Sequence, residues 1–312
     1  MKLGIVFPGQ GAQSVGMLDG YGDSSEVREV LATASEVLKQ DVARLIAEGP
    51  PEELNRTVNT QPVMLTAGYA AYRLWRGLGG PEPVVMAGHS LGEYTALVAA
   101  GALAFEDALP LVRLRAQAMQ EAVPEGQGAM AAILGLDDAA VRAACAESAA
   151  GQVVEAVNFN APGQVVIAGH AEAVERAIER AKALGAKRAV SLPVSAPFHS
   201  SLLGPAAARL KEHLAGINVR APRIPVVNNV DVRICVQPAE IKDALVRQAN
   251  HPVRWVECVQ AIAAQGVTHV AECGGKVLAP LAKRIAEVQS FALVDRDGMT
   301  QTLAELKAAG WS

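Results

Sequence analysis

The chain of 312 residues contains few aromatic side chains and no excess of positive charge. Only 4% of its residues are aromatic, and 28 Lys and Arg stand against 32 Asp and Glu, so the formal net charge is −4. Binding to nucleic acid needs clustered positive charge for the phosphates, and often aromatic rings on which the bases stack. The composition therefore argues against a nucleic-acid partner.

Cysteine is scarce, and the four cysteines lie far apart in the sequence. No C-x-x-C spacing and no pair of histidines completes a zinc site. We expect neither a metal nor a cofactor, and we expect the thiols to be free and buried in a reducing compartment. These residues are Cys145, Cys235, Cys258 and Cys273.

Long hydrophobic runs are also lacking. The longest, from Ala96 to Phe105, contains Gly101 and falls well short of the ~20 residues that span a bilayer. The apolar run at the N-terminus is too short for a signal segment and ends at Pro8. The sequence therefore predicts a cytoplasmic protein that does not enter the membrane.

The chain is rich in short apolar segments that alternate with helical patterns. Hydrophobic residues make up 51% of the chain and charged residues 19%, which excludes disorder. Continuous apolar strands separated by helices are typical of an α/β fold with a parallel sheet covered on both faces. The predicted strands are Leu3–Phe7, Pro83–Ala87, Ile224–Val230, Thr268–Cys273 and Phe291–Asp295. The predicted helices include Gln61–Gly77, Ser90–Ala100, Ala239–Gln248, Val253–Gln265 and Lys276–Val288.

The middle of the chain predicts a different order of elements. Strand, helix, two strands, helix and strand follow one another, which is the βαββαβ order of a ferredoxin-like domain. We expect this small domain to span residues 127–197 and to be inserted into a larger domain of residues 1–126 and 198–312. The cleft between the domains is the expected ligand site. The six elements are Ala129–Leu134, Asp137–Ala149, Val153–Phe159, Val165–Ala168, Ala171–Leu184 and Lys187–Pro193.

Residues 88–92 carry the strongest motif for catalysis. Gly88-His89-Ser90-Leu91-Gly92 fits the pattern G-x-S-x-G between a predicted strand and a predicted helix. In that setting the tight turn lifts the serine hydroxyl above the sheet, at the start of a helix whose N–H groups favour negative charge. The motif predicts that Ser90 is a nucleophile.

A serine nucleophile needs a base, and His199 is the best of the six histidines. It lies where the predicted small domain returns to the large one, so it is expected at the cleft. His213 is expected to be solvated and His269 to lie in the core, whereas His89 is expected to point away from the site. His170 and His251 stay open as alternatives. No nearby acidic residue completes a triad, so we expect a dyad oriented by another group.

A glycine-rich loop follows the first predicted strand. Phe7-Pro8-Gly9-Gln10-Gly11 could turn backbone N–H groups into the cleft and form an oxyanion hole with the N–H of Leu91. A phosphate-binding loop is the alternative, but neither of the two common glycine patterns for phosphate is present.

Arg115 is expected on the apolar face of the predicted helix Glu106–Ala122, together with Leu111 and Ala118. A buried guanidinium must be paired. Its partner could be a structural carboxylate, or a carboxylate of the substrate held by both nitrogens of the guanidinium fork. The pattern alone leaves both readings open.

Taken together, these segments resemble the malonyl-CoA:acyl-carrier-protein transacylases of type II fatty acid synthesis. The resemblance runs from Phe7 to about Leu306. Besides the two glycine-rich motifs, it rests on Asn158–Asn160 with Pro162 and Gln164, on Pro225–Asn229, and on Gln248–Trp255. One departure is the sequence Cys273-Gly274-Gly275-Lys276, where the family usually reads Gly-Pro-Gly-Lys. We expect a less rigid loop there.

The resemblance implies a hydrolase-like large domain and a ping-pong transfer of malonyl from malonyl-CoA to acyl carrier protein by a monomer. Ser90 would be the nucleophile, His199 the general base and acid, and Arg115 the ligand of the malonyl carboxylate. The resemblance further implies an oxyanion hole from the backbone of Gln10 and Leu91, substrate contacts from Asn160 and Phe198, and a backbone carbonyl of Gln248 that orients His199.

Other functions remain open. A related acyltransferase, such as the malonyl-transfer subunit of malonate decarboxylase or a polyketide acyltransferase, would share the same active site. A serine hydrolase and a non-catalytic module that binds carrier proteins are further alternatives. A docking surface for an acidic carrier protein is expected to be basic, although solvated faces explain such residues equally well. The candidates are Lys187, Arg188, Lys276, Lys283 and Arg284.

Overall fold

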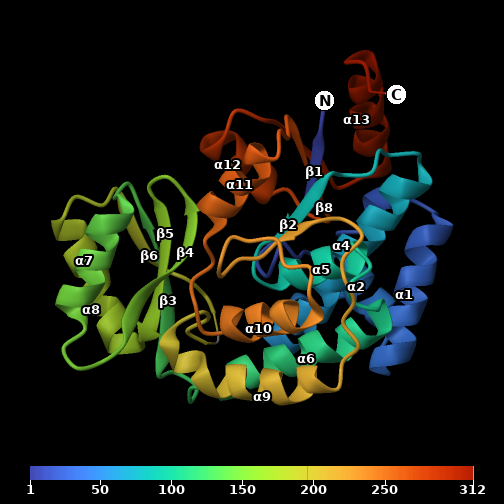
Figure 1. Ribbon diagram of the computed structural model, residues 1–312. Coiled ribbons are helices and arrows are strands. Elements are labelled where there is room, and N and C mark those ends of the chain that lie inside the picture. Colours follow the sequence, from blue (N-terminus) through green and yellow to red (C-terminus); the bar gives the residue numbers. More distant parts are fainter. Residues whose placement is uncertain (195, 312) are drawn as a thin grey trace.

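A five-stranded parallel sheet lies at the centre of the larger part of the molecule (Figure 1). The computed structural model describes residues 1–194 and 196–311. The strand order is β7-β2-β1-β8-β9, and every neighbouring pair is parallel. The strands are β1 (Leu3–Phe7), β2 (Val85–Gly88), β7 (Val226–Val227), β8 (His269–Cys273) and β9 (Gln289–Leu293).

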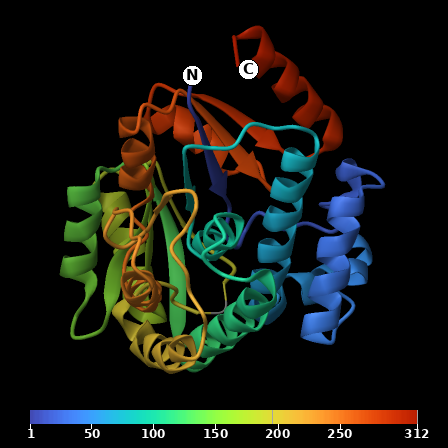
Figure 2. The same ribbon diagram turned by 45° about the vertical axis from the view of Figure 1, so that its right-hand side comes forward.

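Both faces of this sheet are covered by helices, which explains why β1 is buried along its whole length. Ile5 and Phe7 point into one apolar cluster and Val6 into another, as the alternation of a strand requires. On one side lie α1 (Ser25–Leu38), α2 (Val42–Glu48), α3 (Pro51–Leu54), α4 (Thr57–Gly77), α5 (Leu91–Ala99), α6 (Phe105–Glu121), α9 (Gly204–Ala215), α10 (Pro238–Gln248) and α13 (Arg296–Ala308). The other side is covered by α11 (Trp255–Ala264) and α12 (Leu278–Ile285). Figure 2 shows α4 and α5 against the sheet from a second direction.

A separate antiparallel sheet is built from residues 128–191. Its order is β4-β5-β3-β6, and α7 (Asp138–Ser148) and α8 (Ala171–Ala183) cover one of its faces. The other face packs on the main core through Met130 and Val166. The fold is therefore α/β with one parallel and one antiparallel sheet, and the predicted order of elements in this segment is confirmed. The strands are β3 (Gly128–Leu134), β4 (Val154–Ala161), β5 (Gln164–His170) and β6 (Arg188–Ser191).

Two predicted strands were placed wrongly. The run Ile224–Val230 forms only the short strand β7, because the Asn228 side chain accepts a hydrogen bond from the backbone of Asp231 and turns the chain out of the sheet. The run Phe291–Asp295 is shifted to Gln289–Leu293, because Asp295 caps the start of α13 by accepting from the N–H of Gly298.

In the part of the chain that the structure describes, no helix is long and apolar enough to cross a bilayer.

The two sheets are joined by backbone hydrogen bonds between β4 and the segment before α11. The N–H of Phe159 donates to the carbonyl of Val253, and the N–H of Val253 donates to the carbonyl of Val157. This seam brings β4 beside the carboxyl ends of the parallel strands.

Candidate active site

Ser90 lies in a sharp turn between β2 and α5, with φ at +53°. Glycine is required on both sides, because a Cβ at Gly88 would lie 1.8 Å from the backbone of Gly92, and one at Gly92 would lie 2.0 Å from the carbonyl oxygen of Phe7. Asn229 holds this turn: its Oδ1 accepts from the N–H of Ser90 at 2.8 Å, and its Nδ2 donates to the carbonyl of Gly88 at 2.8 Å. The left-handed backbone of the serine is thus fixed from outside the turn.

Ser90 and His199 are in hydrogen-bond contact. The distance from Ser90 Oγ to His199 Nε2 is 2.7 Å, and His199 Nδ1 lies 2.8 Å from the backbone carbonyl of Gln248. Because a carbonyl only accepts, Nδ1 carries the proton, and Nε2 is left as the acceptor for the serine hydroxyl. Burial and the nearby charge of Arg115 lower the pKa of His199 to about 3. The imidazole is therefore a neutral base.

Arg115 is 1% exposed, and its guanidinium is held by neutral groups. Its Nη1 donates to Gln61 at 2.8 Å, and its Nη2 donates to Gln248 at 2.9 Å and to Ser90 Oγ at 3.1 Å. The guanidinium carbon lies 5.3 Å from the ring centre of Tyr94. Within residues 1–194 and 196–311 no carboxylate forms an ion pair with this group, and its Nε has no hydrogen-bond partner. The structural carboxylate considered from the sequence is not found there.

Glu93 is a buried carboxylate that the sequence analysis missed. It lies in the first turn of α5, and its Oε2 accepts from the backbone N–H of Asn229 and from Gln248 Nε2, both at 2.9 Å. Burial raises the pKa of this carboxyl to about 7. A signal was present, because Glu93 is the only charged residue of the otherwise largely apolar helix α5. A charged residue is rarely buried without partners, so a lone charge in an apolar helix next to a nucleophile indicates a specific role.

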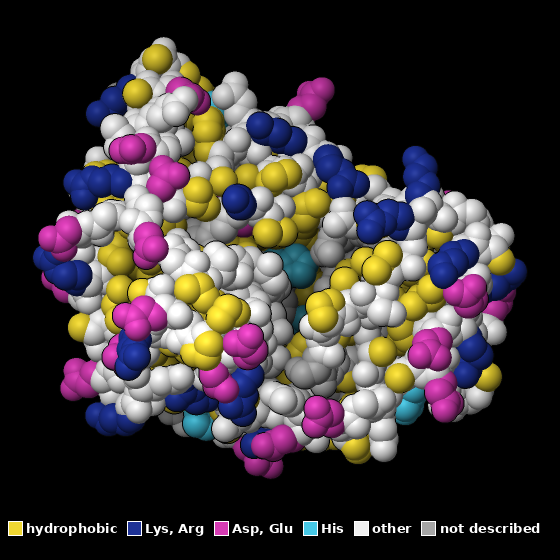
Figure 3. Space-filling view, turned by 180° about the vertical axis from the view of Figure 1, so that it is seen from behind, with side chains coloured by type: hydrophobic (Ala, Val, Ile, Leu, Met, Phe, Trp, Pro, Cys, Tyr) yellow, Lys and Arg dark blue, Asp and Glu magenta, His cyan; other side chains and the backbone are white. Residues whose placement is uncertain are grey.

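Ser90, Arg115 and His199 border a cavity of about 500 Å³ between the two sheets. One wall comes from the larger part of the molecule and includes Gln10, Ser90, Leu91, Arg115, Phe198 and His199. The other comes from Met130, Asn158, Leu192, Pro193 and Val194. Figure 3 shows a hollow on this face with histidine at its floor. The lining is largely apolar around a few convergent polar groups, as is usual for sites that bind small molecules.

The loop after β1 lies directly against the nucleophile turn. A Cβ at Gly9 would lie 2.6 Å from the carbonyl oxygen of His89, which only glycine avoids. Leu91 is the first residue of α5, so no carbonyl of its own helix can accept from its N–H. Gln10 and Leu91 both border the cavity beside Ser90.

His89 is also a residue of the cavity lining, and its side chain contacts α11 and β4. Its ring packs 5.5 Å from that of Trp255, and its Nε2 lies 2.7 Å from Asn160 Oδ1. Asn160 thus contacts His89, and its role toward substrate stays a prediction. Asn158, two residues earlier on β4, lines the cavity, and Asn55 borders it as well.

The loop in which the family's usual proline is replaced by glycine is anchored by Glu272. This buried carboxylate at the end of β8 accepts from the N–H groups of Val277, Leu278 and Ala279 at 3.0, 2.7 and 2.8 Å. A Cβ at Gly275 would lie 2.7 Å from the Pro8 ring. The carboxylate thus caps α12 and fixes the loop next to the glycine-rich segment after β1.

Known proteins resemble this chain over nearly its whole length. Residues 5–275 match the family of the acyl transferase domain. The malonyl CoA-acyl carrier protein transacylase of Escherichia coli K12 is 54% identical over 307 residues, which cover 98% of this chain and 99% of that protein.

Solved structures agree in fold. An acyl-carrier-protein S-malonyltransferase from Burkholderia pseudomallei superimposes with a TM-score of 0.96 at 65% identity, covering 97% of this chain and all of the other. A malonyl-transacylase in complex with its type II PKS acyl-carrier protein gives a TM-score of 0.96 at 50% identity, covering 98% of this chain and all of the other. The chain therefore belongs to the malonyl-CoA:acyl-carrier-protein transacylase family of enzymes.

Proposed function

We propose that this chain transfers the malonyl group from malonyl-CoA to the phosphopantetheine thiol of acyl carrier protein, through a malonyl ester on Ser90. The observation that carries the proposal is the buried guanidinium of Arg115, which has no ion-pair partner among the residues that the structure describes. It lies 3.1 Å from the oxygen of a serine that is already bonded to a neutral histidine. A fixed cation beside a nucleophile selects an acyl group that carries its own carboxylate.

In the first half-reaction, His199 Nε2 takes the proton of Ser90 as Oγ attacks the thioester carbonyl. The N–H groups of Gln10 and Leu91 bind the oxyanion of the tetrahedral intermediate. The intermediate collapses, the C–S bond breaks, and the CoA thiolate leaves with the proton from His199. Malonyl then remains on Ser90 as an oxygen ester.

In the second half-reaction, the thiol of the carrier protein replaces CoA. His199 removes the thiol proton, sulfur attacks the ester carbonyl, and the serine oxygen leaves with that proton. The carbonyl of Gln248 keeps the Nδ1 proton in place throughout. A largely apolar cavity disfavours water as the competing acceptor.

The malonyl carboxylate also affects the base. Arg115 is the second cause, after burial, of the low pKa of His199. When the carboxylate binds Arg115 it offsets that positive charge, so His199 more readily accepts the serine proton. Malonyl is therefore favoured over acetyl in the rate of acylation as well as in binding, which argues against a general serine hydrolase.

Two further proposals concern the architecture. We interpret residues 127–197, which contain the whole antiparallel sheet, as a ferredoxin-like domain inserted into a hydrolase-like domain of residues 1–126 and 198–312. We also propose that the enzyme acts as a monomer, because a single chain supplies both walls of the cavity.

For the carrier protein we propose a docking surface formed by basic side chains in or next to β6 and α12, namely Lys187, Arg188, Lys276, Lys283 and Arg284. Arg284 donates to the Gln164 side chain at the start of β5 at 2.7 Å, and to the carbonyl of Pro162 in the turn between β4 and β5 at 3.2 Å. Gly135, beside the Lys187 side chain, donates to Gly163 in the same turn. These contacts place Lys187 and Arg284 on the two sides of one turn. Figure 3 shows Lys and Arg gathered along one side of the hollow, which suits an acidic partner.

Intact-protein mass spectrometry after brief mixing with malonyl-CoA or acetyl-CoA tests the proposed function. We expect a malonyl adduct that Ser90→Ala abolishes, and a preference over acetyl that Arg115→Ala removes. A folded protein that forms no adduct with either donor would contradict the proposal.

For the docking surface, Lys187→Glu with Lys283→Glu should raise the KM for carrier protein but not for malonyl-CoA, whereas Lys211→Glu on α9 serves as the control.

A further inference from the structure

Two opposite charges are buried in the active site without touching each other. Glu93 and Arg115 are 2% and 1% exposed, and no ion pair joins either of them to another group in the described part of the chain. Burying an unpaired charge costs several kcal/mol unless other groups satisfy it. Other groups must therefore stabilise the two buried charges.

The carboxamide of Gln248 bridges them. Its Oε1 accepts from Arg115 Nη2 and its Nε2 donates to Glu93 Oε2, each at 2.9 Å. The amide thus turns its acceptor toward the cation and its donor toward the anion, so the two charges together select one of its two orientations. In that orientation Nε2 also donates to the backbone carbonyl of Ser90 at 3.0 Å.

Gln248 contacts all three groups of the proposed mechanism. Its backbone carbonyl holds His199 Nδ1, its Oε1 holds the guanidinium, and its Nε2 holds the nucleophile turn. A displacement of this one residue would move the base, the anion site and the serine together. What fixes Gln248 therefore fixes the catalytic geometry.

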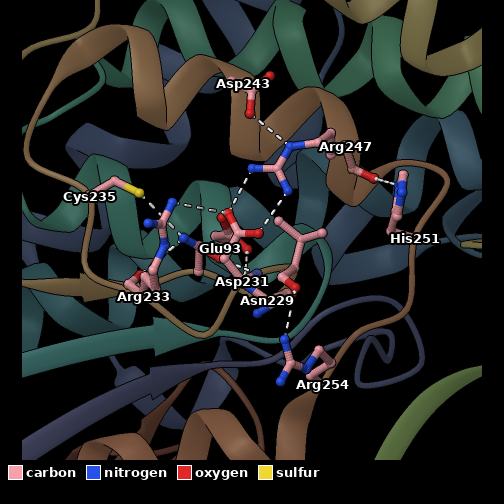
Figure 4. A network of polar contacts seen from close by, with 11 residues as sticks. Glu93, Asn229, Asp231, Arg233, Cys235, Asp243, Arg247, His251 and Arg254 are labelled. Carbon is pink, nitrogen blue, oxygen red and sulfur yellow. Dashed lines mark hydrogen bonds and ion pairs between the residues drawn. The ribbon is translucent and has the colours of Figure 1, made fainter.

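Gln248 is the last residue of α10. Polar contacts around the neighbouring Arg247 fix this end of the helix (Figure 4). The neighbouring Arg247 donates to both carboxylate oxygens of Asp231, at 2.8 and 2.6 Å, and to Asp243 at 2.7 Å. Asp231 belongs to the same loop as Asn229, whose N–H reaches Glu93. Nearer the surface, the ion pair between Arg247 and Asp231 joins this loop to α10. In the interior, the carboxylate of Glu93 joins both the loop and α10 to α5.

We propose that Glu93 is a positioning residue that holds Gln248, and through it aligns His199 and Arg115. It takes the place of the acid that the dyad lacks, but it acts through one intervening residue instead of on the imidazole itself. The inference rests on the proposed function, since it assumes the roles given above to Ser90, His199 and Arg115.

The charge of Glu93 has a separate effect on the substrate. A malonyl carboxylate on Arg115 adds a second negative group on the other side of the guanidinium, and the two carboxylates repel each other. The charged or titratable groups around Glu93 are Arg115 from α6, Asp231 from the loop, Cys258 from α11 and Tyr94 from its own helix. Burial already opposes the ionised form of Glu93, so a bound malonyl group favours its protonation further.

Three variants separate geometry from charge. Glu93→Gln keeps an acceptor for both hydrogen bonds and removes the charge. Glu93→Asp keeps the charge on a side chain one methylene shorter, and Glu93→Ala removes both. The readout is the rate of acylation by malonyl-CoA and by acetyl-CoA in stopped-flow mixing, with Glu240→Gln on the exposed side of α10 as the matched control.

We expect Glu93→Ala to slow acylation by both donors roughly 10²-fold, since small misplacements of reacting groups cost that much. Glu93→Asp should fall between this variant and the wild type. Glu93→Gln should restore the rate to within severalfold of the wild type and lower the KM for malonyl-CoA, but not for acetyl-CoA.

A purely structural role would not produce this split between donors or the rescue by glutamine. Wild-type acylation rates in folded Glu93→Ala, or a Glu93→Gln variant as slow as the alanine variant, would overturn the inference. In either case the wild type would still form its malonyl adduct. Absence of the adduct in the wild type would instead refute the proposed function.

Discussion

The low pKa of His199 makes a prediction about pH that distinguishes this site from an ordinary serine–histidine pair. The base is active only when neutral, so activity is lost as the pH falls through its pKa. For a histidine with the usual pKa of 6.5, about 3% is neutral at pH 5. With the pKa lowered to about 3, about 99% is neutral at that pH. Acylation should therefore persist into mildly acidic solution.

The assay is the pH dependence of kcat/KM for acylation by malonyl-CoA between pH 4.5 and 8, because this parameter reports the free enzyme. We expect changes of no more than severalfold over this range, including the effect of Glu93. Folding is checked at each pH by circular dichroism. The Arg115→Met variant, measured with acetyl-CoA, removes the second cause of the shift but leaves the burial. Its acidic limb should therefore move up toward 6.5 without reaching it.

Two results would refute this reasoning. A tenfold loss of kcat/KM per pH unit below pH 6 in the wild type would mean that His199 has a nearly ordinary pKa, and that the site is more hydrated than its burial indicates. An acidic limb at the same pH in the wild type and in Arg115→Met would mean that the guanidinium does not act on the imidazole.

Three more predictions follow from the geometry. Arg115→Met should reduce kcat/KM for malonyl-CoA roughly 10²–10⁴-fold, which corresponds to the loss of about two charge-assisted hydrogen bonds to the malonyl carboxylate. The same acylation assay should show no matching loss for acetyl-CoA. Gly92→Ala should lower the free energy of unfolding, measured by urea titration, by more than about 3 kcal/mol, because its Cβ would lie 2.0 Å from the Phe7 carbonyl oxygen. Gly204→Ala is the control and should have little effect, because the space around Gly204 is open. Glu93→Gln should remove a pH dependence of stability, because the pKa of the carboxyl is about 4.5 in the unfolded chain but about 7 in the folded one. The free energy of unfolding of the wild type should therefore fall by about 2–3 kcal/mol relative to the variant between pH 5 and 8, and equal slopes would contradict this.

The sequence predicted those features of the site that local patterns determine. The strand–turn–helix around Ser90 follows from glycines and apolar runs, and the apolar face of α6 predicted that Arg115 is buried. The contact of His199 with Ser90 followed from its place in the order of elements, although 109 residues separate the two.

Other features could not be read from local patterns, because they depend on contacts between distant segments. Asn229 holds a turn 139 residues earlier in the chain, and Gln248 and Glu93 are 155 residues apart. Neither amide lies in a pattern that marks it as a partner of the nucleophile turn. The position of β9 was missed for a similar reason: its register is set by pairing with β8, where Gln289 lies opposite His269.

The two walls of the cavity have different consequences for how such an enzyme can diverge. Ser90, Arg115, His199 and Gln248 all lie outside residues 128–194, which contribute only the facing wall. Substitutions at Met130 or in the 192–194 segment therefore alter the surface that an incoming thiol arm meets, while the reacting groups keep their positions. A lineage could change which thiol arm fits the cavity by altering residues 128–194, and retain its bond-making chemistry unchanged.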